Sequence, residues 1–349
     1  MPAEKDQSMK KTSAYTRREF MKQMALGAGM IMPLSVVGFT SNELISSSII
    51  TIRRLPYNRV KNQHGAKVKV FAVGESGQNA ILRLFNETGR IDGTIEYILI
   101  DAGTSKGLVG RPALSEEQSK EIIKDIIDDS HLVFILAGLG QDATTGVVPV
   151  LSDFSKKKRA LGITVVSAPE IEDKRHNILY ATQRLKSWCH AGDCIIKIPG
   201  NNSSNPINKR HLFSSQSFDM LMAEAVSGIC QTIFSQGLTC LDFADIKLFF
   251  EGAKDVSIGI GWGQGEKRAI TAINYAWNDL ISRKKSIVLS RGVMLFLITN
   301  EDFTFNELED GIDMIYHTQP SLLQSEFTWA SNVNRRIKKG AMQAIIYGC

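Results

Sequence analysis

Five short apolar runs of strand length alternate with segments of helical periodicity in the first two thirds of the chain. The runs cover residues 68–73, 95–100, 132–137, 163–167 and 194–198. Near-continuous apolar strands separated by helices are typical of a parallel sheet that is covered on both faces. This alternation predicts an α/β fold.

One of these runs leads directly into a glycine-bearing turn. Residues 131–151 read HLVFILAGLGQDATTGVVPVL, an apolar strand followed by a turn and a helical pattern. Such a unit aims backbone N–H groups and the positive end of a helix dipole at one point, which suits a phosphate. An ordinary strand-to-helix turn fits the same residues. Residues 68–85 form a second unit of this kind, with Gly74 and Gly77 in its turn and Asn79 at the helix start.

Two helices are indicated by apolar residues at helical spacing. The first follows Leu114 and has a capping box of Ser115 and Gln118. The second covers residues 217–234 and has Gly237 as its stop. The side chains expected to be buried are Ile122, Ile123, Ile126 and Ile127 of the first helix, and Leu221, Met222, Ala225, Val226, Ile229, Ile233 and Phe234 of the second. Cys230 is predicted to be a small core residue.

The formal charge of +5 is concentrated in the N-terminal segment. Residues 1–62 contain ten Lys or Arg against four Asp or Glu, and the remainder contains 31 against 32. The rest of the chain therefore has no excess of positive charge with which to neutralise phosphates, and nucleic-acid binding is disfavoured. The five cysteines show neither paired metal spacing nor a disulfide framework.

The N-terminal segment resembles a twin-arginine export signal. Residues 16–22 read TRREFMK, and a moderately apolar stretch that contains Pro33 follows at 24–39. We expect residues 1–40 to be a signal or a membrane anchor and residues 41–65 to be a linker. The other interpretation is a tail with two chance arginines.

Several blocks of the chain, in order, resemble FtsZ, the bacterial member of the tubulin superfamily. The resemblance covers residues 67–349 and includes the two glycine turns, IPGNN at 198–202, AVSGI at 225–229, CLDFADI at 240–246, GIGWGQGEKRA at 259–269 and RGVMLFLIT at 291–299. It implies a Rossmann-like nucleotide domain with a parallel sheet at 66–215, a long central helix at 216–238 and a smaller α+β domain at 239–349. In that last domain we expect helices at 243–250 and 266–278 and strands near 293–298 and 343–347.

The resemblance implies that GTP phosphates rest on the two glycine turns. The corresponding residues are Gly74, Ser76, Gly77, Gln78 and Asn79 in the first turn, and Gly138, Gly140, Ala143, Thr144, Thr145 and Gly146 in the second. The chain departs from the family pattern in several places, where Glu75, Ser76 and Gln78 replace glycines and Gln141, Asp142, Ala143 and Thr144 differ.

The carboxylates of Glu75 and Asp142 would lie beside the phosphates. A like-charge pair at about 5 Å and a dielectric of about 20 repels by roughly 3 kcal/mol, which weakens binding about a hundredfold unless a cation bridges it or the side chain turns away. Added Cβ atoms also disfavour the positive φ angles that glycine permits. We therefore expect a weakened GTP site.

Other positions are implied to contact the rest of the nucleotide. Glu172 and Arg175 resemble the family's ribose-contacting pair, and Asp219 falls where a carboxylate or amide reads the guanine edge. Asp242 and Asp245 match the acids with which one subunit positions cation and water at the nucleotide of the next, so hydrolysis needs a filament. The ordinary interpretation of these two acids is a helix N-cap and a first-turn acid.

Together these features predict an FtsZ-like cytoskeletal protein that binds GTP with Mg²⁺ and assembles head to tail with itself or with a cognate FtsZ, its GTP hydrolysis being weakened. The alternative is a non-hydrolysing paralogue that acts as a structural or regulatory scaffold. We expect the protein at the cytoplasmic face of the inner membrane, held there by its N-terminal segment. The periplasm is the alternative if that segment is a true export signal.

Overall fold

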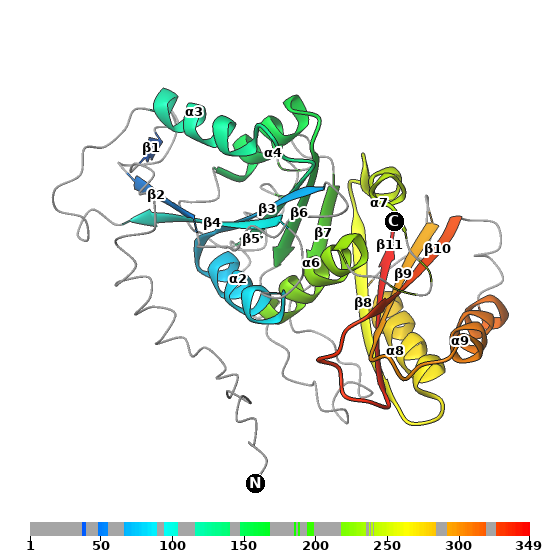
Figure 1. Cartoon of the computed structure of the whole chain (residues 1–349). Coiled ribbons are helices and arrows are strands. Elements are labelled where there is room, and N and C mark those ends of the chain that lie inside the picture. The colour runs from blue at the N-terminus through cyan, green and yellow to red at the C-terminus, as the bar shows by residue number, and fades with distance from the viewer. Residues whose placement is uncertain are drawn as a thin grey trace, which may run out of the picture.

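The structure is a computed structural model built around one 11-stranded sheet with strand order β1-β2-β4-β3-β5-β6-β7-β8-β11-β9-β10 (Figure 1). It describes residues 37–39, 48–54, 66–88, 94–103, 116–139, 147–167, 185, 188, 194–198, 218–234, 237, 239, 241–283, 292–318 and 326–349. The five predicted apolar strands are confirmed as β3 (Lys67–Val73), β4 (Thr94–Gly103), β5 (Leu132–Gly138), β6 (Leu161–Ser167) and β7 (Cys194–Ile198). They pair in parallel, as the α/β prediction requires.

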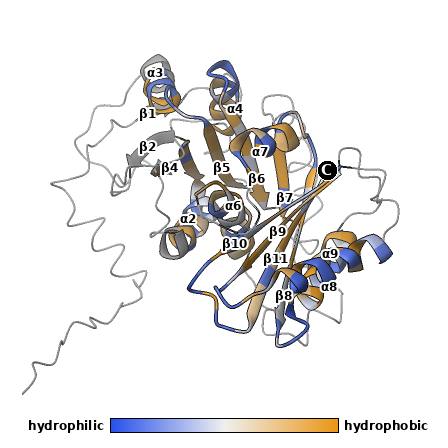
Figure 2. Ribbon diagram, turned by 45° about the vertical axis from the view of Figure 1, so that its right-hand side comes forward, coloured by the Kyte–Doolittle hydropathy of each residue, from blue (hydrophilic) through white to orange (hydrophobic). Residues whose placement is uncertain are grey.

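Helices cover both faces of this parallel half because successive side chains of each strand point to opposite sides. In β5, Leu132 and Phe134 belong to one core cluster and Val133 and Ile135 to another. Helices α2 (Gly74–Thr88) and α6 (Phe218–Phe234) contribute to the first cluster, and α3 (Glu116–Ile127) and α4 (Val147–Lys157) contribute to the second. Figure 2 shows the strands as a hydrophobic layer, with polar surface on the outer sides of the helices.

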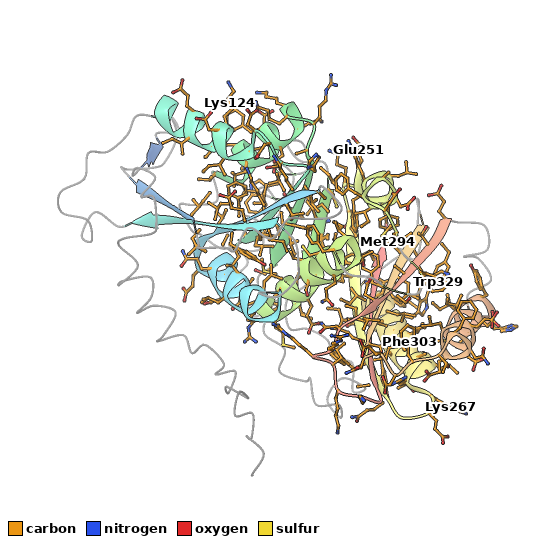
Figure 3. The ribbon with its side chains drawn as sticks, viewed as in Figure 1. Lys124, Glu251, Lys267, Met294, Phe303 and Trp329 are labelled. Atoms are coloured by element: carbon orange, nitrogen blue, oxygen red, sulfur yellow. The ribbon has the colours of Figure 1, made fainter. Side chains whose placement is uncertain are left out.

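The burial predicted for the helix after Leu114 is confirmed in α3. Ile123, Ile126 and Ile127 are fully buried, and Ile122 packs against the same cluster while partly exposed. Lys124 lies on the outer side of this helix (Figure 3). Ser115 lies outside the described residues, so its capping role stays a prediction.

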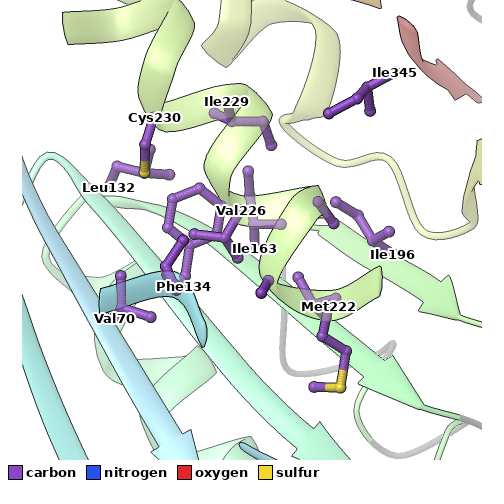
Figure 4. Packing of buried hydrophobic residues seen from close by; sticks show 14 of the residues in the cluster. Val70, Leu132, Phe134, Ile163, Ile196, Met222, Val226, Ile229, Cys230 and Ile345 are labelled. Atoms are coloured by element: carbon purple, nitrogen blue, oxygen red, sulfur yellow. The ribbon is translucent and has the colours of Figure 1, made fainter. Parts of the chain in front are cut away.

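The predicted central helix is confirmed as α6, which is buried on all sides from Leu221 to Phe234. One side packs on the parallel sheet, where Val226 and Cys230 lie among side chains of β3, β5 and β6 (Figure 4). The other side faces the C-terminal half, where Tyr347 Oη donates to the Ala225 carbonyl at 2.6 Å. Asn332 Nδ2 donates to Thr232 Oγ1 at 2.7 Å, so these two polar groups of the buried helix have partners in the C-terminal half.

The C-terminal half continues the same sheet. It contains α7 (Phe243–Phe250), β8 (Val256–Gln264), α8 (Arg268–Arg283), β9 (Gly292–Thr299), α9 (Phe305–Thr318), β10 (Glu326–Val333) and β11 (Ala341–Gly348). Strand β8 pairs in parallel with β7 and antiparallel with β11. The predicted elements at 243–250, 266–278, 293–298 and 343–347 are found, and β8, α9 and β10 were not predicted.

Three alternate glycines of β8 let helix α8 lie directly on the strand. A Cβ atom at Gly259 would lie 2.0 Å from the Ala276 carbonyl oxygen, and one at Gly261 would lie 2.1 Å from that of Ala272. At Gly263 it would lie 1.9 Å from the Arg268 carbonyl oxygen. These separations exclude any side chain, so backbone meets backbone along the whole contact.

The N-terminal segment differs from its prediction. Residues 48–54, expected within a linker, form strand β2 (Ser48–Arg54), which pairs antiparallel with β4. Residues 37–39, expected in the signal or anchor, form β1 (Val37–Phe39) beside β2. Among the residues that the structure describes, no helix combines the length and the apolar character that a membrane crossing requires.

Candidate functional site

Helix α2 begins immediately where β3 ends, and Gly74 makes the turn with a φ of 73°. Gly77 lies so close to β5 that a Cβ atom there would be 2.3 Å from the Leu136 carbonyl oxygen. The first predicted phosphate turn is therefore the first turn and a half of a helix, whose N–H groups point toward the carboxyl edge of the sheet.

The substituted glycine positions of this turn carry no backbone strain. Among the described residues, Arg159 is the non-glycine residue with positive φ. Glu75, Ser76 and Gln78 therefore hold backbone angles that side chains tolerate, and the positive φ angles that a Cβ atom disfavours are not used at these three positions. Their helical conformation is the physical reason. Glu75 is exposed in the first turn of α2, where the helix dipole favours a negative charge.

Asp219 brings the central helix to this turn. It lies in the first turn of α6, and Ser76 Oγ donates to its Oδ1 at 3.3 Å. Burial raises the pKa of the Asp219 carboxyl, while hydrogen bonding from Ser76 and Asn79 and the charge of Arg83 oppose that rise, and Glu75 adds to it. A half-buried carboxylate thus faces the N-terminus of α2 and is partly satisfied by donors from it.

The second predicted turn starts beside the first. A Cβ atom at Gly138, the last residue of β5, would lie 3.3 Å from Ser76 Cβ and 3.5 Å from Ser167 Oγ. The remaining predicted contacts lie outside the described residues: Gly140, Asp142, Ala143, Thr144, Thr145, Gly146, Glu172 and Arg175. Their roles stay predictions.

Asp242 and Asp245 form a reciprocal capping box at the start of α7. Asp245 N donates to Asp242 Oδ1 at 2.9 Å, and Asp242 N donates to Asp245 Oδ2 at 3.1 Å. The ordinary interpretation as N-cap and first-turn acid is thus realised. Both residues are exposed, and the box engages one oxygen of each carboxylate. The capping box leaves the second oxygen of each carboxylate unused by these two bonds. The cap is therefore compatible with a role in positioning a cation and water.

The two acids lie at the opposite edge of the sheet from Asp219. The rings of His131 and Phe243 meet edge to face, with centroids 6.3 Å apart, and place the start of α7 at the amino end of β5. Ser76 and Gly138 lie at its carboxyl end. Helices α2, α6 and α7 all contribute to one core cluster, and Figure 1 shows α6 between α2 and α7. A helix of the 17 residues of α6 spans about 25 Å, so the acids of one chain cannot reach its own Asp219.

Sequence reasoning missed the contact between Ser76 and Asp219. The two residues are 143 positions apart, and no local pattern connects them. The only available signal was a hydroxyl at a position where the resembled family has glycine. Sequence reasoning also did not separate Asn79, whose amide contributes to holding Asp219, from the phosphate contacts.

Comparison with known proteins agrees with this geometry. No family model matches the chain. It is 28% identical over 299 residues to cell division protein FtsZ 1 of Methanocaldococcus jannaschii, covering 79% of this chain and 81% of the relative. It is 28% identical over 278 residues to FtsZ of Methanothermobacter thermautotrophicus, covering 72% of this chain and 71% of the relative.

Solved structures show the same fold. An empty FtsZ dimer from M. jannaschii superposes with a TM-score of 0.66 at 24% identity and covers 81% of this chain and 88% of that one. CetZ2 from Haloferax volcanii, solved as a GTPγS-bound protofilament, gives a TM-score of 0.61 at 12% identity, with 81% and 92% covered. The mostly parallel sheet, the buried central helix and these relatives agree. The chain is FtsZ-like in sequence over most of its length and has the FtsZ/tubulin fold.

Proposed function

We propose that this protein binds GTP at the edge of the sheet where α2 and α6 begin, and that its subunits assemble head to tail. Asp242 and Asp245 of one subunit would then act on the nucleotide of the next. The observation that carries this proposal is that Asp219 lies in the first turn of α6, a helix about 25 Å long, whereas the two acids begin α7 beside the amino end of β5. An arrangement of this kind performs chemistry only when two copies meet.

The residues at the α2 end fit a guanine nucleotide. The N–H groups of the first turn of α2 suit a phosphate, and the Asp219 carboxylate accepts hydrogen bonds without donating any. Guanine presents two adjacent N–H donors on its edge, whereas adenine presents a donor beside an acceptor. Glu75 opposes the phosphate charge, and Mg²⁺ between them would offset that repulsion. The relatives support this proposal, because CetZ2 is solved with GTPγS in a protofilament and FtsZ as a dimer.

A mixing experiment tests the composite arrangement. Asp245→Asn removes a charge but keeps an oxygen that can accept from Asp242 N, so the capping box survives. Asp219→Ala removes the proposed base contact and leaves the acids intact. Each variant alone should release little phosphate from GTP. A mixture should regain activity, because some contacts then join an intact nucleotide end to an intact acidic end.

The control for the mixing experiment is Glu251→Ala, at the far end of α7 (Figure 3). This change should leave phosphate release at the wild-type level. No recovery in the mixture, with both variants still pelleting together, would refute the composite site. Phosphate release at the wild-type level by the Asp245→Asn variant alone would refute a role for the negative charge of Asp245.

The second candidate function is a non-hydrolysing scaffold, and the exposed carboxylate of Glu75 at the phosphate position favours it. Labelled GTP with Mg²⁺, titrated into the protein with sedimentation in parallel, separates the two. GTP-dependent pelleting with phosphate release supports the GTPase. Pelleting without phosphate release, or without any bound nucleotide, supports the scaffold.

We also propose that residues 1–36 tether the protein to the cytoplasmic face of the inner membrane. Strand β1 supports this, because its pairing with β2 places residue 37 at one edge of the sheet. Protection of the protein from external protease while the inner membrane is intact is the expected result. Release of a shortened chain into the periplasm would overturn the assignment.

A further inference from the structure

We propose that Ser76 is a positioning residue for base recognition: its hydroxyl holds the Asp219 carboxylate in the orientation that accepts two adjacent N–H groups, and it thereby sets the selectivity for guanine. This inference rests on the proposed binding of GTP. It concerns a residue that stands where the family pattern has glycine, which has no hydroxyl to offer.

The position of the Ser76 side chain is set by the backbone around it. Gly77 packs on β5 so closely that a Cβ atom there would meet the Leu136 carbonyl oxygen at 2.3 Å. Ser76 Cβ itself lies 3.3 Å from the point where Gly138, at the end of the same strand, would carry a Cβ atom. The start of α2 therefore cannot slide along the strand. The hydroxyl is presented to α6 from a fixed point.

That hydroxyl reaches the acceptor that the base would use. Ser76 Oγ donates to Asp219 Oδ1 at 3.3 Å, a long separation for a bond between a hydroxyl and a carboxylate. Hydrogen bonds in ligand-free sites are commonly long and tighten when the ligand binds. The bond restricts rotation of the carboxylate before any nucleotide arrives, so less order must be acquired on binding.

The number of acceptor sites on Asp219 matches the donors available. An ionised carboxylate offers about four lone-pair sites. Ser76 donates to one oxygen, which leaves enough sites for two further N–H groups. Guanine has two N–H groups side by side on its edge, at N1 and at the 2-amino group. Inosine has only the first of these, so the pair GTP and ITP reports directly on whether both remaining sites are aligned.

The charged groups around Asp219 predict how its titration responds. Glu75 raises the pKa of the Asp219 carboxyl, Arg83 lowers it, and the hydrogen bond from Ser76 also lowers it. Both charged residues lie on α2 and are unchanged by a substitution at Ser76. Removal of the hydroxyl should therefore raise the pKa of Asp219 further, since the ionised form loses a donor.

The test compares wild type and Ser76→Ala in the full chain, with Ser282→Ala as the matched control. Ser282 also donates its hydroxyl, to the Asp279 carbonyl at 2.8 Å, but it lies on α8 in the C-terminal half. Affinities for GTP, ITP and ATP are measured with Mg²⁺ across a range of pH. Carbon-13 NMR of labelled aspartate follows the Asp219 titration in nucleotide-free protein.

In Ser76→Ala, the dissociation constant for GTP should rise about fivefold to tenfold and that for ITP much less, so that the preference for GTP over ITP shrinks. The pH below which the affinity for GTP falls, the acid limb of binding, should move to a higher value. Ser282→Ala should change neither quantity. An equal loss for GTP and ITP with an unmoved acid limb would overturn the proposal, and so would tighter binding of GTP.

Failure of the proposed function has a different signature. If wild-type protein binds no GTP, the nucleotide assignment falls, and the positioning role is then decided by NMR alone. An Asp219 titration that is the same in wild type and Ser76→Ala would overturn that role as well.

Discussion

Arg268 at the start of α8 holds three loops of the C-terminal half together, and its replacement by methionine should be severely destabilising. Its side chain is 4% exposed, and the guanidinium forms a bidentate pair with Glu307, with Nε to Oε1 at 3.0 Å and Nη2 to Oε2 at 3.1 Å. It also donates to the Asp302 carboxylate at 3.0 Å and to the Asp302 carbonyl at 2.8 Å. Asp302 in turn accepts from Gly340 N at 2.7 Å.

The magnitude follows from the burial of the partners. The Asp302 and Glu307 side chains are 29% and 22% exposed, so both lose their cation in a largely desolvated place. Breaking such a pair costs about 3–5 kcal/mol, because charges are left uncompensated. Methionine keeps the apolar stem and therefore limits the loss of packing. The free energy of unfolding, measured by urea denaturation, should fall by about that amount.

The matched control is Arg335→Met. Arg335 pairs with Glu301 at 2.6 Å, yet its side chain is 81% exposed, so the change should cost less than about 1 kcal/mol. A second check uses pH. The arginine and neighbouring N–H groups lower the pKa values of Asp302 and Glu307 below their ordinary 3.8 and 4.5.

Lowered carboxylate pKa values stabilise the fold above the unfolded values, and this stabilisation is lost as the pH falls through the folded ones. The difference in free energy of unfolding between wild type and Arg268→Met should therefore have its full size at pH 7 and should become smaller below about pH 4.5. A gap of less than about 1 kcal/mol at pH 7, or one that does not change with pH, would refute the reasoning.

Three further predictions concern the half of the fold that contains the parallel strands. Gly77→Ala should lower the free energy of unfolding by about 1–3 kcal/mol in urea denaturation, since its Cβ atom would lie 2.3 Å from the Leu136 carbonyl oxygen; an unchanged midpoint would contradict this. Hydrogen bonding from Lys69 lowers the pKa of Asp129 from 3.8 to about 2. The stability that Asp129→Asn lacks at pH 7 should therefore disappear as the pH falls from about 4 toward 2, and a constant deficit would argue against that pairing. Full burial raises the pKa of the Cys230 thiol, so mass spectrometry should find Cys230 alkylated only as fast as the protein unfolds.

The parallel half of the fold could be predicted because its signal is local. Strands such as 132–137 are buried on both faces and read as continuous apolar runs, and β5 follows one of them closely. Strand β8 was missed because alternate glycines replace the apolar residues that mark a strand, and the reason for those glycines lies in α8. Strand β10 was missed because several of its side chains are only partly buried. Helix α9 has buried Leu308, Ile312 and Ile315 at helical spacing, which a closer reading of period could have found.

The candidate site was predictable only in its parts. The spacing of Asp242 and Asp245 matches a capping box, and the structure contains it. The contact between Ser76 and Asp219 depends on how α6 packs across the sheet, and no short stretch of sequence predicts it. The helical backbone at Glu75 and Gln78, which avoids the positive φ angles that their Cβ atoms disfavour, was not predicted from the sequence. The nucleotide roles of these residues remain predictions.

The glycines of β8 also bear on how substitutions in this chain would combine. A side chain at Gly259, Gly261 or Gly263 would meet the same helix, α8. The first such substitution would lift α8 from the strand, and a second would then find room already made. Double variants should therefore lose less stability than the sum of the single ones, which makes the three positions an energetically coupled unit. Whether a side chain is tolerated at one of these positions depends on the residues at the other two. Substitutions at the three positions are therefore expected to accumulate together rather than independently.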